Sequence, residues 1–320
     1  MICTGTNIVL AIAGPILRDP KAIMTPKSAA ELRPMVGADA PLISSVSDTA
    51  QWVATYRAWE SARADALFKD PYAEQLAGER GRAIARHMPR QARNGWPLIV
   101  RTVLIDELIT ASIAEGCDCV VNLAAGLDTR PYRMSLPSSL TWVEVDLPAM
   151  INFKERFLSA ETPACRLLRR PVDLAEAGAR RQLFAELETH GSKILVIAEG
   201  LLIYLEAEVV AALARELAGC PNVRWWVFDL ASPNLLRGIQ RTMKSVLEHA
   251  PMRFAPANGV AFFEALGWSV AEVRSQLRAA VRLRRLPTLL RWASWFPDPN
   301  PRKLGQARWS AVVRLVNGIA

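Results

Sequence analysis

The sequence is poor in the residues that build metal sites and disulfide frameworks. Its 320 residues include five cysteines and three histidines. Cys117 and Cys119 form a C-x-C, but no second pair and no nearby histidine completes a zinc set. The odd number of cysteines and their irregular spacing are typical of a protein in a reducing compartment. We therefore expect a cytoplasmic protein without a metal site.

Long apolar runs and export signals are also missing. Residues 8–17 form an apolar patch that is too short to span a bilayer. No lysine or arginine precedes the patch, as a signal peptide would require. Prolines then interrupt any helix, at Pro15, Pro20, Pro26, Pro34 and Pro41. We expect residues 1–45 to be a poorly ordered leader without a membrane role, in which Met24 or Met35 is an alternative start.

Charge gives little support for a nucleic-acid partner. The net charge of +8 would suit an anionic partner. However, the arginines are scattered, and the densest group is Arg282, Arg284 and Arg285. Basic and aromatic residues are not interleaved in the manner of RNA-binding proteins. We interpret the charged positions mainly as solvated faces of a globular protein and expect no nucleic-acid partner.

Short apolar segments alternate with helical patterns after residue 117. The predicted strands are residues 119–123, 141–145, 166–171, 193–198 and 223–228, and the predicted helices between them are residues 149–158, 175–188 and 206–217. This alternation indicates an α/β fold with a parallel sheet and right-handed crossovers. Residues 258–266 are predicted as a further helix, and residues 277–295 as partly helical. Residues 268–273 and 309–316 could close the sheet as an antiparallel pair.

The preceding part of the chain is predicted to be helical. A first helix begins near Ser47, which is a suitable N-cap residue. Trp52, Tyr56 and Trp59 share one face of this helix, so they either pack on a core or form an aromatic wall over a pocket.

A second helix, residues 97–116, carries Arg101 in its apolar stripe. A buried guanidinium needs a partner. Arg101 therefore either forms a salt bridge with an internal carboxylate or clamps the carboxylate of a ligand.

A turn of small residues follows the first predicted strand. It contains Ala124, Ala125 and Gly126. Such a turn lets the backbone approach a ligand at the carboxyl end of a sheet. One glycine leaves little room for a pyrophosphate, for which G-x-G-x-x-G is typical. The turn favours a ligand that has an adenosine and no phosphates, and S-adenosyl-L-methionine (SAM) is the common one.

Acidic residues stand at the ends of four predicted strands. Some of them will cap the helices that follow. Asp146 lies about 20 residues beyond the turn, where a carboxylate can accept from both ribose hydroxyls, and Glu144 could serve instead. Asp173 offers a carboxylate to an adenine amino group, and Leu174 offers an apolar contact to the ring. The carboxylate of the methionine part of SAM would form an ion pair with Arg101.

Residues 122–133, NLAAGLDTRPYR, resemble the signature of the leucine carboxyl methyltransferase family. This family of SAM-dependent O-methyltransferases includes bacterial enzymes of polyketide tailoring. Four further blocks agree in order, at residues 64–73, 99–102 with Asp106, 144–148 and 198–205. The resemblance covers roughly residues 46–320. The glycine that usually precedes the signature's second glycine appears here as an alanine, which makes the loop slightly tighter.

The resemblance implies the fold and the domain organisation. The fold class would be the class I methyltransferase Rossmann-like sheet, mostly parallel with an antiparallel closing strand, plus an N-terminal helical cap. Residues 46–320 would form a single domain. Within it, residues 46–116 would be the cap and residues 117–320 the core, with a lid insertion at about residues 232–256.

The resemblance also implies roles for individual residues. SAM would be held by Arg101, Ala124, Ala125, Gly126, Asp146, Asp173, Leu174 and Glu199. Glu199 would lie near the amino group or the reacting methyl, and Glu199 and Tyr204 are the candidate catalytic residues. Asp128, Arg130 and Arg133 would brace the loop. Trp52, Tyr56, Met243, Met252 and Phe254 are candidates to line the pocket.

The leading hypothesis is a SAM-dependent O-methyltransferase that acts on a carboxylate or hydroxyl of a small-molecule acceptor. A nicotinamide oxidoreductase is the second hypothesis, against which the missing glycines count. A non-catalytic SAM-binding module, and a protein-carboxyl or RNA methyltransferase, are further alternatives. The sequence does not identify the acceptor, a general base or the oligomeric state.

Overall fold

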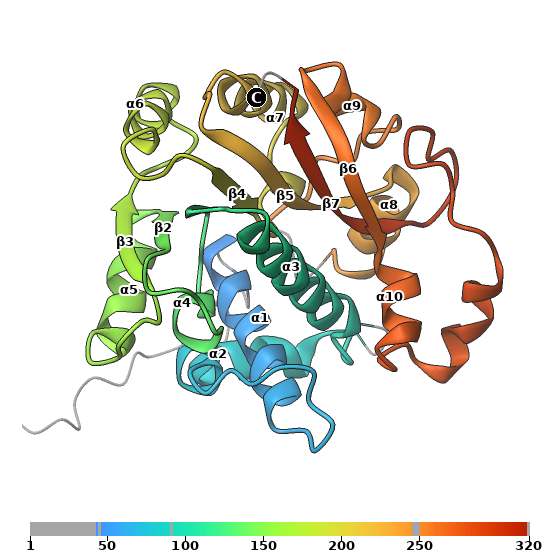
Figure 1. Ribbon diagram of the computed structural model, residues 1–320. Helices are drawn as coiled ribbons and strands as arrows, with labels where there is room; N and C mark the ends of the chain where they lie inside the picture. Colours follow the sequence, from blue (N-terminus) through green and yellow to red (C-terminus); the bar gives the residue numbers. More distant parts are fainter. Residues whose placement is uncertain (1–42, 44–45, 90–91, 245–249, 319–320) are drawn as a thin grey trace, which may run out of the picture. The chain divides into compact units, whose positions relative to one another are not determined.

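A seven-stranded sheet with helices on both faces forms the body of the protein (Figure 1). This computed structural model describes residue 43 and residues 46–89, 92–244 and 250–318. The strands are β1 (Cys119–Leu123), β2 (Thr141–Asp146), β3 (Arg166–Pro171), β4 (Ile194–Ala198), β5 (Val223–Ala231), β6 (Trp268–Ser275) and β7 (Ser310–Asn317).

The helices connect and flank these strands. Those of the first half are α1 (Val46–Ser61), α2 (Ala73–His87), α3 (Trp96–Ala114), α4 (Arg130–Arg133), α5 (Pro148–Leu158) and α6 (Ala177–Leu187). Those of the second half are the 3-10 helix η1 (Leu202–Tyr204), α7 (Ala207–Ala218), α8 (Pro233–Thr242), α9 (Ala261–Glu264), α10 (Gln276–Arg282) and the 3-10 helix η2 (Thr288–Trp295). No helix in the described ranges is long and apolar enough to cross a bilayer.

The strand order β3-β2-β1-β4-β5-β7-β6 confirms the predicted class I methyltransferase sheet. Strands β1 to β5 pair in parallel, whereas β7 pairs antiparallel with both β5 and β6. The order reverses between β1 and β4, and in such sheets ligands bind outside the carboxyl ends of the strands at this point. The topology therefore places the predicted loop and the acidic strand ends at one edge of the sheet.

Successive side chains along the strands point to opposite faces of the sheet and form two separate hydrophobic cores. Val121, Val143 and Val196 point to the face that α6, α7 and α9 cover. Val120 and Trp142 point to the opposite face, where α3 and α10 pack. Strand β1 is buried throughout, as expected for a parallel strand with both faces covered. Helix α3, which the sequence assigned to a cap, is therefore part of the sheet packing.

Helices α1 and α2 pack together beside the sheet, around a cluster that includes Trp52, Tyr56 and Ile84. Ile43 is 1% exposed and belongs to this cluster, so the packed part of the chain starts before the predicted boundary at residue 46. The rest of the predicted leader lies outside the described residues. Helix α1 begins at Val46, and the prediction of Ser47 as its N-cap is therefore wrong.

Several predicted boundaries differ from the structure in the second half of the chain. Strand β5 continues three residues past the predicted end at Phe228, because its pairing with β7 extends to Ala231. The predicted helix at residues 258–266 is reduced to the single turn α9. Residues 277–295 are split into α10 and η2 around Pro287, whose ring does not fit a helix interior.

The predicted lid contains one regular helix in its described part. Helix α8 begins after Ser232, whose hydroxyl accepts a hydrogen bond from the Leu235 amide at 3.3 Å and so caps the helix. Residues 245–249 of the predicted lid lie outside the described residues. The 3-10 helix η2 exposes several large apolar side chains, at Leu289, Leu290, Trp292 and Trp295.

Candidate functional site

A cavity of about 1290 Å³ opens at the carboxyl ends of β1, β2, β4 and β5. Small-molecule sites commonly measure about 300–1,000 Å³, so this cavity has room for a cofactor and a second molecule. Every residue predicted from the sequence to bind the cofactor lines it: Arg101, Ala124, Ala125, Gly126, Asp146, Asp173, Leu174 and Glu199. Tyr204 lines it as well. Their individual roles remain predictions.

The loop after β1 adopts left-handed backbone conformations at two positions. Gly126 has a φ of 50°, which glycine adopts without steric cost. Ala124 has a φ of 52°, a conformation that an L-residue with a Cβ adopts at a cost of roughly 1–2 kcal/mol. Ala124 occupies the position where the family signature usually has glycine. The predicted tightening of the loop therefore takes the form of backbone strain at Ala124.

Asp146 is tied to this loop through main-chain hydrogen bonds. Its Oδ2 accepts from the Gly126 amide at 2.6 Å, and its Oδ1 accepts from the Leu147 amide at 2.7 Å. Burial raises the pKa of Asp146, and these two hydrogen bonds only partly offset that effect. Each carboxylate oxygen has a further lone pair. Asp146 can therefore still accept hydrogen bonds from a ligand such as a ribose.

Glu144 does not compete with Asp146 for this role. Its side chain is fully buried and does not line the cavity. It accepts from Lys154 Nζ at 2.5 Å and from Arg169 Nε at 3.0 Å. Both of its oxygens are thus used to hold α5 and β3 against β2, which excludes the alternative in which Glu144 binds the ribose.

Asp173 and Leu174 follow β3 at the far side of the cavity. Asp173 is exposed, and its Oδ1 accepts from the Ala175 amide at 2.9 Å. Leu174 is half-buried, and its main-chain oxygen accepts from Arg180 Nη1 at 2.8 Å. The neighbouring side chains thus present one acidic and one apolar group to the cavity, as the predicted contacts with an adenine require.

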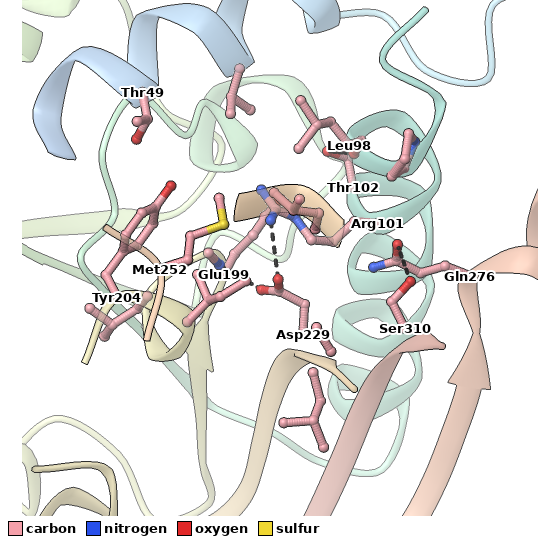
Figure 2. Close-up of a pocket in the computed structure, with 18 of the residues that line it drawn as sticks. Thr49, Leu98, Arg101, Thr102, Glu199, Tyr204, Asp229, Met252, Gln276 and Ser310 are labelled. Carbon is pink, nitrogen blue, oxygen red and sulfur yellow. Dashed lines mark hydrogen bonds and ion pairs between the residues drawn. The ribbon is translucent and has the colours of Figure 1, made fainter. Parts of the chain in front are cut away.

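Arg101 enters the cavity from α3 and forms two ion pairs (Figure 2). Its Nε donates to Glu199 Oε1 at 2.9 Å, and its Nη1 lies 3.2 Å from Asp229 Oδ2. The predicted salt bridge is therefore present. No described residue bonds to its Nη2, which leaves donors for a ligand carboxylate. The clamp on a ligand carboxylate therefore remains a prediction beside the salt bridge.

Gly200 permits this close arrangement. It has a φ of 65°, and a Cβ at this position would lie 3.3 Å from Arg101 Nη1. Its amide donates to Asp229 Oδ1 at 2.6 Å. Asp229 thus holds both the turn after β4 and the guanidinium of Arg101. The sequence showed an acid at the end of the fifth strand but gave no reason to place Asp229 in the site.

Arg130 joins the loop to the same cluster. It is 2% exposed and pairs with Asp106 at 2.6 Å, Asp128 at 2.9 Å and Glu199 at 2.8 Å. Arg133 adds two bonds to Asp106, at 2.8 and 2.9 Å. These contacts agree with the predicted bracing role of Asp128, Arg130 and Arg133.

The two candidate catalytic residues have shifted pKa values. Burial raises the pKa of Glu199, but the charges of Arg130 and Arg101 outweigh it, so the net pKa is lowered. Burial raises the pKa of Tyr204, against the opposing effects of a hydrogen bond with Thr49 and the charge of Arg101. At neutral pH Glu199 is therefore a carboxylate with weak basicity, and Tyr204 is a protonated phenol.

Among the residues predicted to line the pocket, Trp52, Met243 and Met252 do so. Tyr56 and Phe254 do not, and those two predictions are wrong. Tyr56 is turned into the α1–α2 core, where its hydroxyl donates to the Ala92 oxygen at 3.1 Å. Phe254 is 4% exposed because it packs against the rings of Phe262 and Phe263.

The structure also brings side chains into the cavity that sequence reasoning missed. Besides Asp229, they include Gln276 at the start of α10 and Ser310 at the start of β7. Gln276 lies just before the stretch predicted to be partly helical, residues 277–295, and Ser310 lies in a predicted closing strand, residues 309–316. Nothing in the local pattern distinguished them.

Comparison with known proteins gives a consistent family assignment. Residues 50–218 match the model of the leucine carboxyl methyltransferase family. A protein of Frankia alni named "Putative S-adenosyl-L-methionine-dependent methyltransferase" is 32% identical over 270 residues, which span 77% of this chain and 90% of that protein. A second Frankia alni protein of the same description is 33% identical over 260 residues, or 74% of this chain and 88% of that protein.

Solved structures resemble the chain more distantly. Magnesium protoporphyrin IX methyltransferase from Synechocystis, with bound SAH, is 12% identical with a TM-score of 0.44, over 83% of this chain and 99% of that one. A methyltransferase structure from Thermobifida fusca is 14% identical with a TM-score of 0.49, over 86% and 95% of the two chains. These likenesses are too distant to carry an argument about function. The family match and the Frankia relatives confirm the resemblance seen in the sequence. The chain therefore belongs to the leucine carboxyl methyltransferase family, and it is a methyltransferase.

Proposed function

We propose that this enzyme transfers a methyl group from SAM to a carboxylate or hydroxyl oxygen of a small-molecule acceptor. SAM as the methyl donor follows from the family and from the relatives named as SAM-dependent methyltransferases. The acceptor class is the proposal. The observation that carries it is the size of the cavity, which extends from the predicted cofactor contacts to the side chains of α8, α10 and η2.

The residues present fit SAM. The loop at residues 124–126 brings main chain to the cavity at a small-residue turn, Asp146 retains acceptor capacity, and Arg101 retains donors at Nη2. Bound SAM supplies an activated methyl group on a sulfonium centre. Arg101 would bind the methionine carboxylate, Asp146 would orient the ribose, and Asp173 with Leu174 would contact the adenine. The chain's contribution is to hold the two reactants in line and to exclude water.

The walls beyond the cofactor contacts are largely apolar. They include Leu98, Ile239, Leu277, Trp292 and Trp309. Apolar walls suit a molecule with a substantial hydrophobic body, and their closure over the reacting atoms would keep water away. This supports a small organic acceptor, whose whole body such walls can surround.

The nature of the nucleophile bears on the need for a base. A carboxylate acceptor is already ionised, whereas a hydroxyl would benefit from a group that removes its proton. Glu199 has a lowered pKa and Tyr204 a raised one, so neither is suited to act as that base at neutral pH. Their place at the cavity supports roles in positioning rather than in proton removal.

Cytoplasmic location is part of the proposal. The four described cysteines, Cys117, Cys119, Cys165 and Cys220, are free and buried. Burial raises their thiol pKa values, to about 11 for Cys117, so the thiols are unreactive. Unpaired cysteines are usual where thiols are kept reduced.

Calorimetry with SAM and S-adenosylhomocysteine (SAH) tests cofactor binding. We expect Asp146→Ala to weaken SAH binding by about 100-fold, since it removes charge-assisted hydrogen bonds to the ribose. Glu208→Ala, which truncates an exposed acid on α7, is the control and should bind like the wild type. No binding by the wild type, or full affinity of Asp146→Ala, would contradict the proposed site.

Methyl-labelled SAM tests the acceptor class. Wild-type enzyme is incubated with cell extract, and label is measured separately in solvent-extractable metabolites and in precipitated macromolecules. We expect the label among the metabolites. Label in protein or RNA would instead support the macromolecular alternatives. SAH binding without transfer to either fraction would support a non-catalytic SAM-binding module.

A further inference from the structure

Gln276 is a buried amide that points into the cavity from the start of α10. The residue is 5% exposed, and it lines the cavity. Ser310 Oγ at the start of β7 donates to Gln276 Oε1 over 3.1 Å. Figure 2 shows this pair on the opposite side of Arg101 and Asp229 from Tyr204. The hydrogen bond to Ser310 fixes the orientation of the amide.

The amide nitrogen of Gln276 has donors to spare. A glutamine amide offers two N–H donors. Among the residues that the structure describes, none accepts a hydrogen bond from Gln276 Nε2. In an empty cavity water satisfies such a donor, and a ligand that displaces this water has to supply an acceptor in its place. Gln276 is thus a donor held ready for a group inside the cavity.

The surroundings of this donor decide what kind of group it can take. Leu98 and Leu277 line the same part of the chain's cavity, from α3 and α10, and they offer no polar partner. The nearby guanidinium of Arg101 is already paired with two carboxylates, Glu199 and Asp229. The amide of Gln276 carries no charge itself, so an anion bound to it would lose its hydration without gaining a counter-charge from this group. A neutral acceptor atom, in contrast, gains the hydrogen bond without a charge to compensate.

We propose that Gln276, held by Ser310, forms a subsite that binds a neutral carbonyl or ether oxygen on an otherwise apolar methyl acceptor. The inference rests on the proposed function, since it concerns the acceptor part of the same cavity. It makes Gln276 a specificity residue that acts away from the reacting oxygen. The acceptor then carries two oxygens, one that is methylated and one that Gln276 recognises.

A matched pair of probes tests this subsite. Fluorene and 9-fluorenone have nearly the same shape and differ by one carbonyl group. Their dissociation constants are measured by equilibrium dialysis in saturating SAH, for the wild type, Gln276→Leu, Gln276→Met and Ser310→Ala. The readout is the ratio of the two constants in each protein, because the ratio cancels the shared apolar contribution.

We expect Gln276→Leu and Gln276→Met to lower the preference for fluorenone by about 2–10-fold relative to the wild type, as the loss of one hydrogen bond predicts. Ser310→Ala should lower it less, because the donor stays but is no longer held. Gln182→Leu, on the exposed face of α6, is the control and should keep the wild-type ratio. Two substitutions of Gln276 guard against a defect peculiar to one side chain.

Other outcomes overturn the inference. A wild-type ratio in both Gln276 variants would show that the amide does not read the carbonyl, and failure of both probes to bind the wild type would exclude this ligand class. The SAH titration of each protein keeps the two proposals apart. Loss of the carbonyl preference with normal SAH binding supports the subsite, whereas absent SAH binding by the wild type removes the proposed function itself.

Discussion

Two parts of the same cavity rim stabilise their buried charges differently, one through ion pairs between side chains and the other through main-chain hydrogen bonds. At the ends of β4 and β5, Arg101 and Arg130 meet Glu199 and Asp229 in a cluster of ion pairs. At the ends of β1 and β2, the carboxylate of Asp146 accepts hydrogen bonds from the main-chain amides of Gly126 and Leu147, beside a strained loop. In the first part the charges are already paired, although Arg101 Nη2 keeps donors for a ligand. The second part is the one in which a ligand can supply what is missing, and this difference identifies where cofactor affinity should be most sensitive.

The largest expected effect comes from breaking the ion-pair cluster. Arg130→Met removes a 2% exposed guanidinium that pairs with three carboxylates. Loss of one partner from a buried ion pair costs about 3–5 kcal/mol of unfolding free energy. Denaturant unfolding at neutral pH measures the loss. Arg253→Met, which removes an exposed pair with Glu206, is the control and should cost less than about 1 kcal/mol.

Acid should shrink the difference between wild type and Arg130→Met. The pKa values of Asp128 and Glu199 are lowered, since the arginine charges outweigh the effect of burial. Carboxylates with lowered pKa values contribute stability above their unfolded-state pKa, and this contribution is lost as pH falls through the folded-state pKa. A difference that stays constant down to low pH would show that Arg130 acts mainly by packing.

An intermediate effect is expected at Asp146, on cofactor affinity. Its raised pKa means that Asp146 takes up a proton at a higher pH than an ordinary aspartate. Protonation weakens its hydrogen bonds from the ribose, so SAH affinity should fall on acidification, by about tenfold once the charge is lost. Calorimetry over a pH series measures this. Asp146→Asn should bind about tenfold more weakly at neutral pH and lose the acid-dependent fall, whereas Asp173→Asn should retain it.

The smallest effect should come from relieving the loop. Ala124→Gly removes the Cβ from a residue with a φ of 52°. We expect a gain of about 1 kcal/mol in unfolding free energy, because glycine adopts this conformation without the cost that alanine bears. Thermal unfolding with and without SAH measures the change. Gly126→Ala is the reciprocal variant and should destabilise, and equal stability of Ala124→Gly and wild type would contradict the assigned strain.

The sequence was sufficient to predict the parts of the site that lie at the ends of strands. Alternating apolar and helical segments define parallel strands, and the carboxyl ends of parallel strands meet at one edge. That is why Asp146, Asp173 and Glu199 could be expected in one place. Arg101 could be expected there because a guanidinium in an apolar helical stripe has to find a partner.

Other residues depend on packing that no local pattern encodes. Asp229 lies within β5 because the antiparallel partner β7 prolongs that strand, and Asp229 pairs there with Val312, a residue from the far end of the sequence. The antiparallel pair of β6 and β7 was expected, but its register was not, and it is the register that sets Ser275 opposite Ala311 and brings Gln276 to Ser310. Trp52 and Tyr56 share a helical face, yet only Trp52 lines the cavity, since Tyr56 is turned into the α1–α2 core.

The position of β7 also bears on the order in which the molecule can assemble. This strand is the last one in the chain, yet it lies between β5 and β6 in the sheet. During synthesis β6 would have no strand to pair with until residues 310–317, which form β7, have left the ribosome. Non-local pairing of this kind slows folding and leaves strand edges exposed in the meantime. The sheet can therefore close only once residues 310–317 are available, with β7 joining β5 to β6.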